Sequence, residues 1–252
     1  MTTSQSILSI TGLRKVFGGV TALDGIDLEV RQGEILGLIG PNGAGKTALL
    51  NTITGFYRAT SGSIRFMGQE ISSTPLHGIG RLGIGRTFQN IRLFKRMTVL
   101  ENVMAANKRY VRSSFGAFLG VVGRRTALDE ARYWIEFMQL GDRADMPASA
   151  LSYGDARRLE IARALAGNPA LLLLDEPAAG MNETETDQLV ADIHKVQTSV
   201  KAIVLIEHDM SLIRSLSDRI VAMDYGKKLA EGDPDTVLEH PDVRRAYLGS
   251  DT

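Results

Sequence analysis

Short runs of apolar residues, each bounded by glycine or polar residues, occur near both ends of the chain and predict β-strands. Towards the C-terminus these runs alternate with stretches of helical spacing. This alternation is typical of a parallel sheet that is covered by helices on both faces. The predicted strands are Ile7–Ile10, Ile26–Val30, Ile35–Ile39, Ile64–Met67, Leu171–Leu174, Ala202–Ile206 and Ile220–Met223.

The middle of the chain is mostly helical in pattern. Thr98 followed by Glu101 has the spacing of a capping box and predicts a helix start, whereas Gly141 predicts a helix stop. We therefore expect one domain over residues 1–252, with a helical part at approximately residues 93–166 inserted into an α/β core. The predicted helices are Lys46–Thr54, Val99–Arg109, Thr126–Leu140, Asp155–Ala166, Glu183–Thr198 and Met210–Ser217.

The composition excludes several classes of protein. The chain has 252 residues, with 29 basic and 29 acidic side chains, so it lacks the overall basic charge that favours nucleic-acid binding. It has no cysteine, which excludes disulfide frameworks and thiol chemistry. Its longest apolar runs, Ala170–Leu174 and Phe115–Val122, are far shorter than the roughly 18 residues that a membrane-spanning helix needs.

A glycine-rich segment after the strand Ile35–Ile39 carries the first chemical signal. Residues Gly40–Thr47 match G-x-x-x-x-G-K-[ST] in full, and an amphipathic helix follows them. Glycines allow backbone N–H groups to surround phosphate oxygens, and the helix N-terminus adds positive potential. Lys46 is expected to bind the β and γ phosphates, and Thr47 to ligate Mg²⁺. A glycine-rich turn that only starts a helix is the alternative.

Two adjacent carboxylates end the predicted strand Leu171–Leu174. In open α/β sheets, ligands bind at the carboxyl ends of strands. We expect Asp175 to hold Mg²⁺ through water, and Glu176 to act as the general base that takes a proton from the attacking water. The alternative is a solvated acidic turn before Pro177.

The segment Leu151–Leu165 resembles the signature motif of the ATP-binding-cassette (ABC) ATPases, and it precedes the acidic strand as in that family. Ser152 and Gly154 open a helix there, which is either an anion site or an ordinary N-cap. The resemblance implies an α/β P-loop NTPase core with a mostly parallel sheet, an N-terminal antiparallel β subdomain and an inserted helical subdomain. It further implies a head-to-tail dimer that encloses two ATP molecules between phosphate loops and signature motifs.

The resemblance also assigns roles to residues elsewhere. Gln89 matches the glutamine that lies near Mg²⁺ and the attacking water in this family. His208 matches the histidine that contacts the γ-phosphate, and Phe17 matches the aromatic residue that stacks on adenine. Ala179–Asn182 matches the loop that signals between the two sites. The catalytic set is Glu176, His208, Lys46 and Gln89, and the Mg²⁺ ligands are Thr47, Gln89 and Asp175. The ATP-binding residues are Phe17, Asn42, Gly43, Ala44, Gly45, Lys46, Thr47, Ala48 and, in trans, Ser152 and Gly154.

Within the family, the chain is similar to the ATP-binding subunits of branched-chain amino acid importers. This similarity implies transmembrane permease partners, a second identical or paralogous ATP-binding subunit, an extracytoplasmic solute-binding protein acting indirectly, and a peripheral location on the cytoplasmic face of the plasma membrane. The alternatives are importers of urea, amides or other polar solutes, a soluble ABC ATPase and a phosphoryl-transferring kinase. No nucleic-acid partner is expected. The features of this similarity are Phe17–Val20, Arg86–Phe94, Tyr110–Arg125, Tyr153, Ala178–Glu185 and Glu239–Gly249.

Two positions depart from the family pattern, and one apolar segment has two interpretations. Ala48 replaces a hydroxyl residue that commonly reaches the α-phosphate, and Asp155 replaces a glutamine or glutamate at the end of the signature, so both changes bear on the turnover rate. The apolar segment Phe115–Val122 is interpreted either as packing on the helical part or as a contact surface for the permease.

Overall fold

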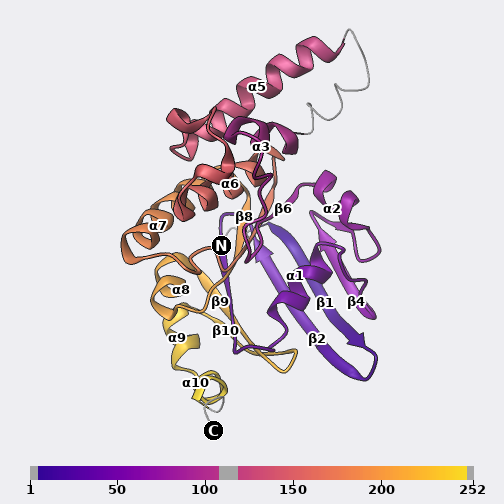
Figure 1. Cartoon of the computed structure of the whole chain (residues 1–252). Helices are drawn as coiled ribbons and strands as arrows, with labels where there is room; N and C mark the ends of the chain where they lie inside the picture. Colours follow the sequence, from indigo (N-terminus) through magenta and orange to yellow (C-terminus); the bar gives the residue numbers. More distant parts are fainter. Residues whose placement is uncertain (1–4, 108–118, 249–252) are drawn as a thin grey trace. The chain divides into compact units, whose positions relative to one another are not determined.

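The computed structural model describes residues 5–107 and 119–248, which form two compact units (Figure 1). The first unit contains the described residues within Met1–Ile84, Ala170–Glu176 and Ile193–Thr252. The second unit contains those within Gly85–Pro169 and Pro177–Asp192. The assignment of residues 1–252 to a single functional domain stays a prediction.

Two sheets carry the strands. The four-stranded sheet is antiparallel and has the order β2-β1-β4-β5, as expected for the N-terminal part. The six-stranded sheet has the order β10-β9-β3-β8-β7-β6; β3 pairs in parallel with both β8 and β9, and β8 with β7, so the predicted α/β class is confirmed. The strands are β1 (Ser6–Phe17), β2 (Val20–Arg31), β3 (Ile35–Ile39), β4 (Ser61–Phe66), β5 (Gln69–Glu70), β6 (Ile84–Arg86), β7 (Leu171–Asp175), β8 (Ala202–Ile206), β9 (Arg219–Asp224) and β10 (Lys227–Gly232).

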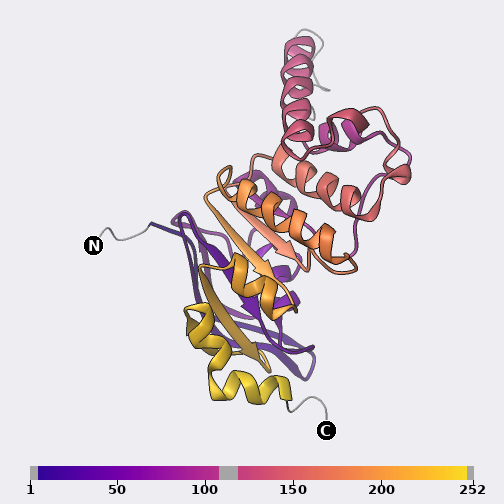
Figure 2. The same cartoon turned by 90° about the vertical axis from the view of Figure 1, so that its left-hand side faces the viewer.

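The core of the first unit explains why its central strands are uninterrupted apolar runs. All five residues of β3, of β7 and of β8 are buried, because the sheet is covered on both faces. Helix α1 (Lys46–Ile53) contributes Leu49, Leu50 and Ile53 to this core, as its spacing predicts. Helices α8 (Met210–Leu216), α9 (Pro234–Glu239) and α10 (Pro241–Leu248) lie in succession beside β9 and β10 (Figures 1 and 2).

The described part of the second unit is mainly helical. Helices α3 (Val99–Ala106), α5 (Leu119–Phe137) and α6 (Tyr153–Ala166) pack on one another through buried apolar residues such as Val103, Ile135 and Leu159. Helix α7 (Glu183–Gln197) begins in this unit, and two short 3₁₀ turns, Gly141–Arg143 and Ala148–Ala150, lie between α5 and α6. Within the described residues, no helix combines the length and the apolar character that crossing a membrane requires.

Several element boundaries differ from the sequence prediction. Helix α3 starts with the predicted capping box but ends at Ala106, because Asn107 has an extended backbone. Helix α5 begins at Leu119 rather than at Thr126, and it ends before Gln139, whose φ of 58° stops the helix earlier than Gly141. Elements β5, β6, β10, α2 (Leu76–Leu82), α9 and α10 were not predicted. Residues 115–118 of the apolar segment Phe115–Val122 lie outside the described residues, and its remainder lies in the first turn of α5.

Candidate functional site

The phosphate-loop segment connects β3 to α1 in the first unit and approaches neighbouring backbone at both ends. A Cβ atom on Gly40 would lie 2.2 Å from the carbonyl oxygen of Met223, and one on Gly45 would lie 2.7 Å from that of Ala22. Gly45 also has a φ of 103°, which side-chain-bearing residues rarely adopt. Glycine is therefore required at both positions by close packing as well as by backbone conformation.

The loop leaves the start of α1 open to a ligand. Asn42 and Gly43 are exposed, Ala44 is buried and Gly45 is the N-cap residue of α1, where no side chain accepts the first helical N–H groups. Ala48 lies half-buried in the first turn and packs against the core. An uncapped helix N-terminus next to a glycine loop is a ready anion site.

Lys46 lies inside this loop. Its side chain is buried, and its Nζ donates hydrogen bonds to the carbonyl oxygens of Gly40 at 2.5 Å and Pro41 at 3.1 Å. Burial lowers the pKa of Lys46, while the negative charges of Glu176 and Asp175 oppose this shift. The cation and both carboxylates of the predicted site therefore lie close enough to interact.

Glu176 and His208 are brought into direct contact by the pairing of β7 and β8. Asp175, which is buried, pairs with Ile206, and the N–H of Glu176 donates to the carbonyl of Ile206 at 2.9 Å. Glu176 has a φ of 49°, a left-handed conformation that turns the chain sharply at the strand end. Its Oε1 lies 2.6 Å from Nε2 of His208, so these side chains form one hydrogen-bonded pair.

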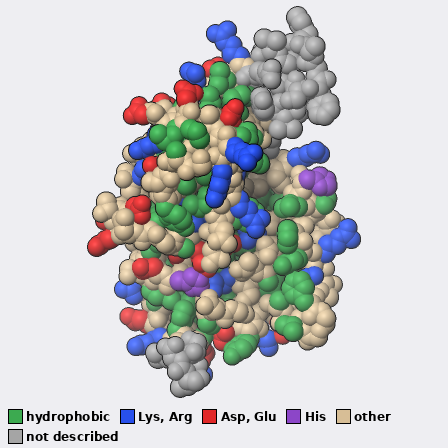
Figure 3. Space-filling model, in the orientation of Figure 1, with side chains coloured by type: hydrophobic (Ala, Val, Ile, Leu, Met, Phe, Trp, Pro, Cys, Tyr) green, Lys and Arg blue, Asp and Glu red, His purple; other side chains and the backbone are tan. Residues whose placement is uncertain are grey.

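Phe17 lies at the end of β1 in an aromatic cluster. Phe17 is 40% exposed, and its ring packs edge-on against the Tyr57 ring with 4.8 Å between the ring centroids. The centroid of the Phe56 ring lies 5.2 Å from that of Tyr57. Lys15 Nζ lies 4.5 Å from the centre of the Phe17 ring. Hydrophobic side chains also show on this part of the surface in Figure 3, over the antiparallel sheet and α2. An exposed aromatic face of this kind is able to stack on a planar base.

The residues of the signature segment lie in the second unit, at the start of α6. Ser152 is the N-cap: its Oγ accepts the N–H of Asp155 at 3.2 Å and donates to the Asp155 carboxylate at 2.7 Å. That carboxylate also faces Arg143 and Arg158 at 3.2 and 3.6 Å, so two cations within the unit offset its charge. Gly154 lies against Glu185 of α7, and a cavity of about 100 Å³ opens between the starts of the two helices.

Gln89 is held in the second unit by a buried ion pair on α6. Arg157 is fully buried, and it donates to the Glu160 carboxylate at 2.7 Å and to the carbonyl oxygens of Phe88 and Gln89 at 2.8 and 3.0 Å. Glu160 in turn accepts the N–H groups of Phe88 and Arg92 at 3.4 and 3.5 Å. The Gln89 side chain itself is exposed. One pair of charges thus fixes the backbone of the Gln89 segment to the signature helix.

Comparison with known families identifies the class to which these features belong. The model of the ABC transporter family matches residues 23–179, which include both the loop and the acidic strand end. The chain belongs to the ABC transporter ATP-binding family. Residues 227–252 also match the family described as branched-chain amino acid ATP-binding cassette transporter. As a member of the ABC family, the protein is an ATPase.

Individual ABC proteins are similar to the chain over nearly its whole length. The high-affinity branched-chain amino acid transport ATP-binding protein BraF of Pseudomonas aeruginosa is 46% identical over 98% of this chain and 99% of its own. Protein LivG of Escherichia coli K12, which has the same description, is 44% identical over the same shares of the two chains. The ADP conformation of MJ1267, an ATP-binding cassette of an ABC transporter, superposes with a TM-score of 0.86 at 30% identity, covering 98% of this chain and all of that one.

The structure adds contacts from residues outside the phosphate-loop, signature and acidic-strand motifs. Gly226, in the turn between β9 and β10, donates its N–H to the carbonyl of Ala44, and Tyr247 of α10 accepts the N–H of Gly40 at 2.6 Å. Arg157 and Glu160 support the Gln89 backbone. Sequence analysis includes Tyr247 only within the C-terminal segment Glu239–Gly249, and no local pattern indicates its contact with the loop.

Proposed function

We propose that the chain is the ATP-hydrolysing subunit of an importer of branched-chain amino acids. The observation that carries this proposal is the convergence of Lys46, Asp175, Glu176 and His208 at the carboxyl ends of adjacent strands in an ABC ATPase. The relatives named as branched-chain amino acid transport proteins support the choice of cargo.

Nucleotide binding is assigned to the loop and the first turn of α1. The open N–H groups at the start of α1 and the Lys46 ammonium suit the triphosphate, and the exposed Phe17 ring suits adenine. Lys46, which now bonds two loop carbonyls, would exchange these partners for phosphate oxygens. Ala48 offers no hydroxyl for the α-phosphate, so the chain relies there on backbone N–H groups.

Magnesium fits the oxygen-bearing side chains at the site. The Thr47 hydroxyl is exposed at the start of α1, and the Asp175 carboxylate ends β7 nearby in the same unit; both are hard oxygen donors that suit Mg²⁺. Within residues 5–107 and 119–248, no cluster of three or more histidine, aspartate or glutamate side chains forms a metal cage. Gln89, which lies in the second unit, is proposed as a further Mg²⁺ ligand because it matches the glutamine of the family. When bound, the ion neutralises charge on the transferred phosphoryl group.

Hydrolysis is assigned to the Glu176–His208 pair. Glu176 would take the proton of the attacking water, and His208 would hold the carboxylate in place until the γ-phosphate draws the imidazole away. The left-handed backbone at Glu176 aims the carboxylate from the strand end. Lys46 stabilises negative charge that develops on the phosphate oxygens.

A head-to-tail dimer would supply the remaining contacts. Ser152 and Gly154, at the N-terminus of α6, would face the ATP that is held by the loop of a second ATP-binding subunit, identical or paralogous. Movement of the Gln89 segment, which Arg157 couples to α6, would carry the change to transmembrane permease subunits. The subunit would thus act at the cytoplasmic face of the plasma membrane, with a solute-binding protein delivering cargo from the other side.

The Glu176→Gln variant tests the hydrolytic part. We expect ATP binding to persist and ATP hydrolysis to fall by about 10²- to 10⁴-fold, because the amide cannot accept the proton. The exposed Glu239→Gln change at the end of α9 is the matched control and leaves the rate unchanged. Hydrolysis by Glu176→Gln at the wild-type rate would remove Glu176 from this role.

The cargo is tested with the complex of this chain and its permease subunits, reconstituted into vesicles. The proposal predicts ATP-dependent uptake of leucine, isoleucine and valine in preference to urea and amides. Preferential uptake of urea or amides would assign the chain to a related importer. ATP hydrolysis without any associated permease would instead indicate a soluble ABC ATPase.

A further inference from the structure

The C-terminal helix α10 is bonded directly to the first residue of the phosphate loop. The phenolic oxygen of Tyr247 accepts the backbone N–H of Gly40 at 2.6 Å, although 207 positions separate the two residues in the sequence. The carbonyl of the same Gly40 residue accepts the Nζ of Lys46 at 2.5 Å. A single residue therefore joins the last described helix to the lysine of the nucleotide site.

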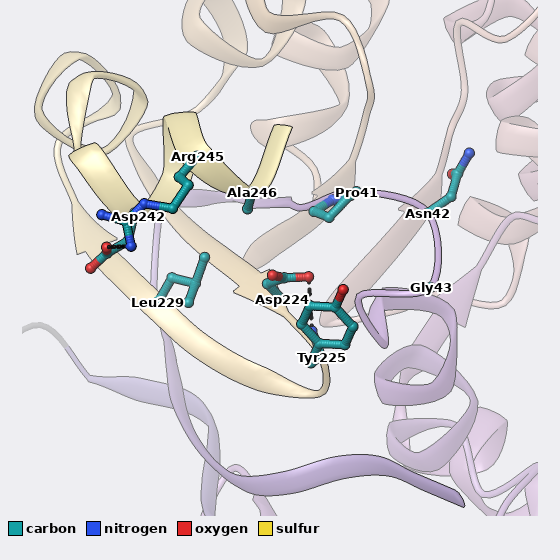
Figure 4. Close-up of a pocket in the computed structure, with 9 residues that line it drawn as sticks. All are labelled: Pro41, Asn42, Gly43, Asp224, Tyr225, Leu229, Asp242, Arg245 and Ala246. Carbon is teal, nitrogen blue, oxygen red and sulfur yellow. Dashed lines mark hydrogen bonds and ion pairs between the residues drawn. The ribbon is translucent and has the colours of Figure 1, made fainter. Parts of the chain in front are cut away.

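The outer part of the loop is separated from α10 by a cavity. This cavity, of about 450 Å³, lies between the loop and the C-terminal elements, with Pro41, Asn42 and Gly43 on one side and Asp242, Arg245 and Ala246 of α10 on the other (Figure 4). Side chains of α10 thus stand apart from the outer part of the loop. Gly40 and Tyr247, which adjoin the lining residues Pro41 and Ala246, form a direct hydrogen bond between these two elements.

Tyr247 is itself held in place. Val243, one turn earlier in α10, is buried, and Tyr247 is half-buried beside it. Burial raises the pKa of the Tyr247 phenol to about 12, so the oxygen stays protonated and neutral at physiological pH. A neutral phenol accepts the Gly40 N–H and also keeps its own O–H as a donor.

Gly40 cannot easily take another position. A Cβ on this residue would overlap the Met223 carbonyl at 2.2 Å, so its backbone already lies against the end of β9. Its N–H points to Tyr247 and its carbonyl to Lys46, and the loop turns directly after it. Small shifts of this residue are accordingly transmitted to the Lys46 ammonium and to the loop N–H groups.

We propose that Tyr247 is a positioning residue of the nucleotide site: it fixes the Gly40 backbone, and through it the Lys46 side chain and the loop, in the geometry that receives phosphate. This inference rests on the proposed ATP-hydrolysing function. It assigns to α10 a part in nucleotide affinity that the motifs of the site do not contain.

The Tyr247→Phe variant provides the first test, because it keeps the ring and removes only the oxygen. We expect KM and Kd for Mg-ATP to rise about 3- to 10-fold, the range for one lost hydrogen bond, while kcat stays within about twofold because Glu176 and His208 are untouched. The Gly40 amide should exchange faster with solvent than in the wild type. Tyr133→Phe, a hydroxyl removed from an exposed tyrosine of the second unit, is the control and leaves KM unchanged.

If the role of Tyr247 were purely structural, Tyr247→Phe would have a lower Tm but unchanged KM and Kd for Mg-ATP. That result would overturn the inference. A second measurement uses the wild type alone. Titration with ADP should shift the NMR signals of both the Gly40 amide and the Tyr247 ring, and an unmoved Tyr247 ring would overturn the inference even if Tyr247→Phe failed to fold. Failure of the wild type to bind ATP would instead contradict the proposed function itself.

Discussion

Replacing Arg157 by methionine should destabilise the second unit by about 3–5 kcal/mol, the usual consequence of breaking a buried ion pair. The variant loses the bond to Glu160 at 2.7 Å and two bonds to the carbonyls of Phe88 and Gln89. It also leaves the Glu160 carboxylate buried without its counter-charge. Burial already raises the pKa of Glu160 against the opposing effect of Arg157, so the loss of that cation raises the pKa further.

A second substitution distinguishes the effect of the unpaired Glu160 charge from the effect of the lost Arg157 packing. Glu160→Gln in the Arg157→Met background removes the buried charge but keeps an oxygen that is able to accept the N–H groups of Phe88 and Arg92. The double variant should therefore be more stable than Arg157→Met by at least about 1 kcal/mol, since contacting charges couple strongly. Arg96→Met, at an exposed arginine of the same unit, is the control and should change stability by less than about 0.5 kcal/mol.

The chain offers a local probe for this measurement. Trp134 is its single tryptophan, and it lies on α5 of the second unit against the rings of Tyr133 and Phe137. Urea unfolding followed by Trp134 fluorescence thus reports on the unit that contains Arg157. An Arg157→Met variant within about 1 kcal/mol of the wild type, or a double variant no more stable than the single one, would refute the reasoning.

Two further predictions concern stability. Thr98→Ala removes the capping box, in which the Thr98 side chain accepts the N–H of Glu101 and the Glu101 side chain accepts the N–H of Thr98. The variant should lose about 1 kcal/mol of unfolding free energy in urea. Equal stability of the variant and the wild type would contradict the capping role. Hydrogen bonds from Ser63 and Ser72 lower the pKa of Glu70 from 4.5 to about 2, so its ionised form adds stability above pH 4.5 that is lost as the pH falls towards 2. Because Glu70 is well exposed, Glu70→Gln should cost well under about 1 kcal/mol at pH 7. In parallel thermal melts this difference should shrink as the pH falls from 4.5 and disappear below about pH 2.

The parts of the fold that sequence predicts are those with a local cause. Ile35–Ile39 and Ala202–Ile206 are uninterrupted apolar runs, and their predicted bounds agree with β3 and β8. The capping box at Thr98 was likewise predicted, because its bonds join residues three apart. Helix ends were predicted less well: Gln139 ends α5 through a left-handed backbone that no side-chain pattern specifies.

The chemical groups of the site were predictable for the same reason, whereas the contacts that hold them were not. Lys46, Asp175 and Glu176 lie in short motifs in which residue type and spacing carry the chemistry. The bond from Gly40 to Tyr247 and the bonds from Arg157 to the Phe88 and Gln89 carbonyls join distant segments. Such contacts depend on which elements the fold places side by side, and one sequence contains no local pattern that encodes this.

The register of the parallel sheet explains why the first-unit residues form one site. Strands β3, β8 and β7 are neighbours, and the loop, His208 and Asp175–Glu176 each occur at or just beyond a carboxyl end. Asp175 pairs with Ile206, and the Glu176 N–H donates to the Ile206 carbonyl. Glu176 is thereby held at the end of β8 that leads to His208, and the two side chains meet at 2.6 Å. A shift of β7 by one residue would turn Asp175 to the other face of the sheet and break this contact. The pairing of β7 with β8 that holds this register is therefore as necessary to the geometry of the site as the carboxylates at the strand end.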